Sequence, residues 1–133
     1  MLFRSGKRQI LYAMTRTGRP LGEFHITGAA VVDWEDIAID DQGHLFVGDI
    51  GNNGARRALL AVHQIDEPDL NKSRSGLARV TRSWVLRFPK EPFDCESLVM
   101  WGGSGYVISK VFEDTRAELF RFSLADSDRK SVV

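Results

Sequence analysis

The stretch VVDWEDIAIDDQGHLFVGDIGNNGARR, residues 31–57, decides the fold of this chain. It contains two short apolar runs, six carboxylates, and a glycine- and asparagine-rich loop that ends in two arginines. Short runs rich in β-branched and aromatic residues, separated by turn residues, are typical of β-strands. The stretch therefore predicts a hairpin whose first strand begins with acidic residues.

The rest of the chain continues this pattern. Turn segments such as TRTGRP and GGSG separate the apolar runs, and no segment has a sustained apolar period of about 3.6 residues. The expected strands are QILYAM, LGEFHIT, WEDIAID, HLFVGDI, LLAVHQI, VTRSWVLRF, ESLVMW, GYVISKV and ELFRFSL. We expect an all-β fold that consists mostly of antiparallel hairpins.

The acidic hairpin recurs further along the chain. DWEDIAID begins at Asp33 and matches DCESLVMW, which begins 61 residues later at Asp94. The same offset places LFVGD on YVISK, and LLAV matches LFRF when one residue is deleted. Four-strand units in series are the sequence signature of β-propeller blades.

This repeat predicts both the fold class and the domain organisation. The fold class is all-β, a β-propeller fragment of about two blades of four-stranded antiparallel sheet. Residues 1–30 are expected to end one blade, residues 31–92 to form a complete blade, and residues 93–127 to form most of the next. Since closed propellers have about 4–8 blades, we expect the sequence to be either a fragment of a longer propeller or a truncated reading frame. A small β-sandwich or barrel is the alternative, because such short strands also suit it.

Composition excludes several partner classes. Apolar residues make up 43% of the 133 residues and charged residues 27%, as in an ordinary globular domain. Lysine plus arginine equals aspartate plus glutamate at 18 each, so nothing points to nucleic acid. No apolar run approaches the roughly 20 residues of a membrane helix. The first residues lack the continuous apolar core of a secretory signal, and the compartment stays open.

The motifs of this chain resemble those of a group of bacterial β-propeller proteins. The shared pattern is a DWEDIA strand, a GDIGNN loop, a D-x-E-[AS]-L strand and a following strand that ends in lysine. The resemblance covers about residues 10–125 and is most specific over residues 33–57. Members are mostly uncharacterised and usually exported. They are more distantly similar to six-bladed propellers of the esterase-like phytase, NHL-repeat and gluconolactonase types, several of which hold calcium in the central channel.

In a propeller, the acidic strand heads converge near the channel mouth. Carboxylates that are brought together repel one another unless a cation compensates them. Calcium suits such a site because it takes about six to eight oxygen ligands. The alternative is that these side chains cap strand ends and accept hydrogen bonds from loop amides. The candidate metal ligands are Asp33, Glu35, Asp49, Asn52, Asp94 and Glu96.

Three cations are candidate ligand-binding residues. Arg56 and Arg57 follow the GDIGNN loop and suit an anionic group, although pairing with local carboxylates is the more ordinary role. Lys110 ends a strand beside the acidic heads, where it is either their counter-charge or a contact for a substrate anion. Cys95 is expected to be a small buried residue, and the three tryptophans are expected to pack between blades.

Two function classes remain. The first is a non-catalytic or uncharacterised β-propeller that binds a small-molecule or protein ligand at its channel face, with calcium in the channel. The second is a metal-assisted hydrolase of ester or phosphoester substrates, in which a carboxylate or bound water acts as the base. The sequence contains no complete catalytic set, so the first class is preferred and the catalytic residues stay unknown.

Overall fold

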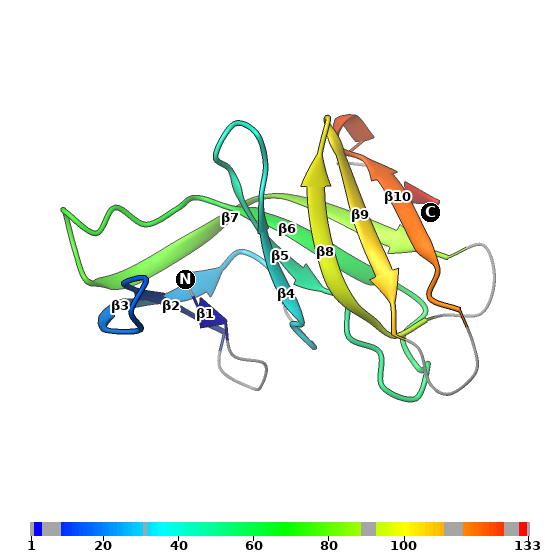
Figure 1. Cartoon of the computed structure of the whole chain (residues 1–133), viewed down its shortest axis with the longest axis horizontal. Coiled ribbons are helices and arrows are strands. Elements are labelled where there is room, and N and C mark those ends of the chain that lie inside the picture. The colour runs from blue at the N-terminus through cyan, green and yellow to red at the C-terminus, as the bar shows by residue number, and fades with distance from the viewer. Residues whose placement is uncertain are drawn as a thin grey trace.

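The computed structural model describes residues 2–3, 9–30, 32–88, 93–110, 116–126 and 131–132. The expected all-β fold is confirmed: the described elements are strands and one short 3-10 helix (Figure 1). Within these residues, no helix is long and apolar enough to cross a membrane. The elements are β1 (Leu2–Phe3), β2 (Ile10–Met14), β3 (Pro20–Thr27), β4 (Asp36–Ile39), β5 (Leu45–Asp49), β6 (Leu60–Ile65), β7 (Ser75–Arg87), β8 (Cys95–Trp101), β9 (Ser104–Ser109), β10 (Leu119–Ser123), η1 (Leu124–Asp126) and β11 (Ser131–Val132).

The strands form two sheets. The larger sheet has the order β1-β2-β3-β7-β6-β5-β4, and β11 pairs with β7 in addition. The smaller sheet has the order β10-β9-β8. The strands β4 to β7 are antiparallel neighbours in chain order, and β8 to β10 have the same arrangement in the second sheet.

The long strand β7 joins two halves of the larger sheet. Its first residues, 75–79, pair in parallel with β3, and its later residues, 80–86, pair antiparallel with β6. Gln64 of β6 pairs with Arg82, whereas the next residue, Ile65, pairs with Val80. The register of the β6–β7 pairing thus shifts by one residue of β7 where β7 passes from one partner to the other. β7 therefore extends across most of the molecule, from the β1–β3 end to the smaller sheet (Figure 1).

Strand β5 is buried along its whole length because it is covered on both faces. Side chains alternate along a strand, so Phe46 packs into one hydrophobic cluster while Leu45 and Val47 pack into another. The first cluster lies between the β5–β7 face and the smaller sheet, and Trp84 is at its centre. The second lies under β2 and β3, which cover the opposite face. Because both faces of β5 are covered, its successive residues 45–47 are all apolar and do not alternate with polar ones.

Strands β4 and β8 lie next to each other, as the sequence repeat predicts. The Asp36 carboxylate joins them, since its Oδ2 accepts a hydrogen bond of 2.7 Å from the Leu98 amide. Its Oδ1 accepts another from the Ile37 amide. Asp36 therefore connects an edge strand of the larger sheet to an edge strand of the smaller one.

The larger sheet differs from the expected separate antiparallel units. Strands β2 and β3 are hydrogen-bonded to β7, so the sheet continues without a break from residues 10–27 into residues 36–87. Both β3 and β11 pair in parallel with β7. The sequence pattern marks strands but not their non-local partners, which is why it missed this pairing. The boundaries expected at residues 31, 92 and 127 lie outside the described residues.

Candidate acidic site

The two acidic segments meet because the end of β5 runs between them. On one side, the Gly51 amide donates to the Asp33 carbonyl (3.1 Å) and the Glu35 amide donates to the Gly48 carbonyl (3.0 Å). On the other side, the Cys95 amide donates to the Ile50 carbonyl (3.2 Å). Segments 33–35 and 94–96 therefore flank residues 48–52, which brings their carboxylates to one place.

Gly51 provides the space in which these carboxylates gather. A Cβ atom at this position would lie 2.5 Å from the Asp33 carboxyl carbon and 2.6 Å from Glu35 Oε1. A side chain at position 51 would force these two carboxyl groups to move, so glycine is what lets them lie this close to the backbone. Gly51 does not need a positive φ, because within residues 51–55 only Gly54 and Ala55 have one.

Asp94, Glu96 and Lys110 form the other half of the site. The Lys110 ammonium lies 2.5 Å from Glu96 Oε1 and 3.8 Å from Asp94 Oδ2. The hydrogen bond to Glu96 raises the pKa of Lys110, so it stays charged as the counter-charge of the cluster. Asp94 Oδ2 is buried and accepts no hydrogen bond from any described residue, although its Oδ1 accepts one from the Asn52 amide.

Excess negative charge at this site is relieved by a proton on Glu35. The pKa of Glu35 is raised from 4.5 to about 7, first by burial and then by repulsion from Glu96, Asp33 and Asp94. A hydrogen bond with the Glu96 carboxyl also favours the protonated form. The four carboxylates thus share one ammonium and, near neutral pH, one proton on Glu35.

We expect the free energy of unfolding to fall between about pH 4.5 and about pH 7 because of Glu35, in the absence of divalent cations. In this window the native state holds a proton that the unfolded state has released, so rising pH favours unfolding. Above the native pKa both states are ionised and the effect ends. Partial exposure of Glu35 screens the interaction, so we expect about 1–2 kcal/mol.

Urea unfolding at about pH 5 and about pH 8 measures this effect. Glu35→Gln, which keeps the shape but cannot ionise, should lose less stability than the wild type over this range. Groups far from the site titrate equally in both proteins, so the difference belongs to Glu35 and the carboxylates coupled to it. An identical pH dependence in the two proteins would show that the Glu35 pKa is not raised.

Asp49 belongs to the scaffold of the loop. It is only 2% exposed, and its Oδ1 accepts hydrogen bonds from the Val32 amide (3.1 Å) and the Asp33 amide (2.7 Å). Its Oδ2 pairs with the Arg57 guanidinium at 2.9 Å. Both carboxylate oxygens are therefore already used within the loop. Asp49 fixes the start of the acidic segment that carries Asp33.

Asn52 and Arg57 close the GDIGNN loop. The Asn52 carboxamide oxygen accepts the Arg57 amide (2.7 Å), and its nitrogen donates to the carbonyls of Arg57 (3.0 Å) and Phe93 (3.3 Å). Arg57 also donates to the Gly51 carbonyl (2.6 Å). The pairing of Arg57 with a local carboxylate is confirmed. These bonds account for Asn52 and Arg57 without a metal or an external anion.

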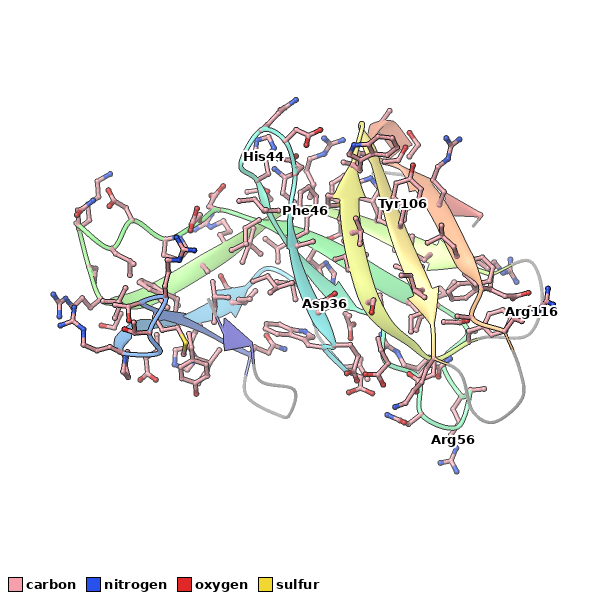
Figure 2. The ribbon with its side chains drawn as sticks, viewed as in Figure 1. Asp36, His44, Phe46, Arg56, Tyr106 and Arg116 are labelled. Carbon is pink, nitrogen blue, oxygen red and sulfur yellow. The ribbon has the colours of Figure 1, made fainter. Side chains whose placement is uncertain are left out.

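The remaining candidates lie at the edge of the site or beneath it. Arg56 is exposed and extends outward from the loop (Figure 2). Cys95 is fully buried, as expected, and burial raises the pKa of its thiol to about 12, with smaller contributions from Asp94 and Glu96. A thiol in that state is not a nucleophile at neutral pH.

The sequence reasoning missed two residues that matter here. It placed Asp33 and Glu35 in the strand itself, but β4 begins only at Asp36, so their convergence comes from the hydrogen bonds to residues 48–51. It also overlooked Asp36 as a link between the sheets, and Gly51 as the space between the carboxylates. The DWED and GDIG motifs contain both residues, but a motif does not reveal what a side chain touches.

The fit of a metal ion to this site is partial. The set of carboxylates has the hard oxygen donors that calcium prefers, and Asp94 Oδ2, which accepts no hydrogen bond from a described residue, is left as a donor for an added cation. Within the described ranges, however, no three acidic, histidine or cysteine side chains are placed to hold one ion as they stand. Binding therefore requires the long side chains of Glu35, Glu96 and Lys110 to move.

Comparisons with family models, curated proteins and solved structures return no match. The class of protein that follows from the fold and the site is an all-β domain with an acidic site where the edge strands β4 and β8 of its two sheets meet.

Proposed function

We propose that this chain is a ligand-binding domain of the β-propeller type whose acidic site binds calcium and thereby fixes the binding face. The observation that carries this proposal is the charge at the site. Among the described residues, the four carboxylates are accompanied by the Lys110 ammonium, and the pKa of Glu35 is raised to about 7, first by burial and then by repulsion from Glu96, Asp33 and Asp94. The proton on Glu35 offsets only part of the negative charge of the carboxylates, and a bound divalent cation would offset more of it.

The arrangement of the strands supports the propeller-type assignment. Strands β4 to β7 form four antiparallel neighbours, β8 to β10 follow in the same order, and β4 lies beside β8. In propellers the first strands of successive blades line the centre. The proposed calcium ligands are Asp33, Glu35, Asp94 and Glu96. Asp49 and Asn52 are left out because their polar atoms are bonded within the loop.

We expect calcium to stabilise the folded chain. At a hundredfold excess over its dissociation constant, an ion that binds only the native state adds about 2.7 kcal/mol, which raises the melting temperature by several degrees. Glu35→Gln and Glu96→Gln each remove one charge from the site with little change in shape and should weaken the response. Calorimetric titration and thermal melts measure both effects.

Glu67→Gln is the matched control. Glu67 is an exposed loop residue, and its substitution removes the same charge far from the site, so the calcium response should persist. Melting curves that are indifferent to calcium would refute the proposal. A response that survives both substitutions in the site would place the ion elsewhere and refute it equally.

A metal-assisted hydrolase is the second candidate, and the pKa of Glu35 near 7 favours it. A carboxyl with this pKa suits a general acid or base at neutral pH. Calcium-dependent release of nitrophenol from nitrophenyl acetate or nitrophenyl phosphate, lost in Glu35→Gln, would support catalysis. Calcium binding without such turnover is the result that we expect.

A further inference from the structure

A cavity of about 330 Å³ lies at the opposite end of β4 and β8 from the acidic site. Its walls are the turn between β4 and β5, residues 40–44, and the turn between β8 and β9, residues 101–103. Figure 2 shows His44 in the first turn and Phe46 below it in β5. The volume is at the lower end of the range of about 300–1,000 Å³ for small-molecule sites. The cavity therefore suits a ligand of one or a few rings.

Trp101 presents an aromatic face at this cavity. It is 69% exposed, whereas Trp34 and Trp84 are 3% and 0% exposed, which corrects the expectation that all three pack inside. The turn that follows it consists of Gly102 and Gly103, both with positive φ, as in a two-residue hairpin turn. The turn therefore fixes the backbone of Trp101 at the rim of the cavity, while its indole stays exposed.

The polar groups of the cavity are also held in place. Asp40 Oδ1 accepts the amides of Gln42 (2.9 Å) and His44 (2.8 Å), and its Oδ2 lies 2.9 Å from His44 Nδ1. Burial alone raises the pKa of Asp40, but these hydrogen bonds outweigh it and lower that pKa. The Arg82 guanidinium lies 5.0 Å from the centre of the Trp84 ring and donates to the Leu124 carbonyl (3.2 Å). Gln64 adds a carboxamide.

The mixture of groups indicates the class of ligand. Two aspartates lie in the wall together with one arginine, so an anion such as phosphate meets repulsion as well as attraction. The Asp41 carboxylate and the Gln64 carboxamide in the wall are planar hydrogen-bonding groups that match vicinal hydroxyls. An aromatic face attracts the polarised C–H bonds on the flat side of a sugar ring. We propose that this cavity is a binding site for a neutral carbohydrate, with Trp101 as the stacking platform.

The test is binding of short neutral oligosaccharides of glucose, galactose, mannose and N-acetylglucosamine to the whole chain. Isothermal titration gives the affinity, and acrylamide quenching gives the position, because Trp101 is the exposed one of the three tryptophans. We expect at least one sugar to bind and to shield tryptophan fluorescence from acrylamide. Trp101→Ala should weaken binding by about tenfold or more, since removal of a central aromatic contact typically has this effect.

Val99→Ala is the matched control. Val99 is an exposed apolar residue of the same strand and is not part of the cavity wall, so its loss should leave the affinity within about twofold. Gln64→Ala tests the polar wall independently and should also weaken binding. Failure of every sugar to bind, binding that survives Trp101→Ala, or binding of free amino acids or phosphate in place of sugars would overturn the proposal.

Discussion

Asp49→Ala is expected to lower the free energy of unfolding by about 3–5 kcal/mol, the usual cost of removing one partner of a buried ion pair. The substitution leaves the amides of Val32 and Asp33 without their acceptor and leaves Arg57 without its carboxylate. Each of these groups then loses a hydrogen bond in a part-buried environment. Urea or guanidinium unfolding measures the loss.

Two further variants make this prediction specific. Asp49→Asn keeps an oxygen acceptor but loses the charge, so its loss should be smaller than that of Asp49→Ala. Asp69→Ala makes the same chemical change at an exposed pair with Lys72 and should cost less than about 1 kcal/mol. Equal losses at positions 49 and 69 would show that Asp49 does not organise the loop. The result also bears on the acidic site, because Asp49 positions the segment that carries Asp33.

Trp84→Ala is expected to cost about 3–5 kcal/mol, as for other large aromatic residues removed from a core. Trp84 is fully buried, and its ring centroid lies 5.7 Å from that of Phe46 and 6.5 Å from that of Phe122. These two phenylalanines belong to different sheets, so the indole fills the space where the sheets pack together. Its loss should therefore weaken the contact between the sheets.

Trp101→Ala is the natural control, since it deletes the same side chain from an exposed position and should change stability by less than about 0.5 kcal/mol. Trp84→Phe should cost much less than Trp84→Ala, because the indole N–H of Trp84 has no hydrogen-bond partner among the described residues and a phenyl ring fills most of the space. Similar losses for Trp84→Ala and Trp101→Ala would contradict the packing role of Trp84.

The acidic residues at the ends of buried strands have two different roles in this chain. Asp49 and Asp36 are joined to backbone amides and hold segments together. Asp33 and Glu35 instead lie against Gly51, and Glu96 is hydrogen-bonded to Glu35. Together they leave a net negative charge that Lys110 balances only in part. The first role explains stability, and the second is the basis of the proposed calcium site.

The sequence by itself determined the strands and one long-range neighbour relation. Strand periodicity and turn residues are local signals, so the hairpins β4–β5 and β8–β9 follow from alternation and from glycine turns. The match between the segments at Asp33 and Asp94 also predicted that these segments lie together, as they do at β4 and β8. The burial of Cys95 and the pairing of Arg57 were predicted for similar local reasons.

Only the tertiary structure decided which carboxylates are bound within the fold and which remain in the site. Asp49 ends β5 and Asp94 precedes β8, yet the first is saturated by hydrogen bonds and the second keeps a buried oxygen that accepts none from the described residues. The raised pKa of Glu35 and the exposure of Trp101 depend likewise on residues distant in the chain. Hydrogen-bond saturation, desolvation and exposure are set by non-local neighbours, and a local pattern carries no information about them.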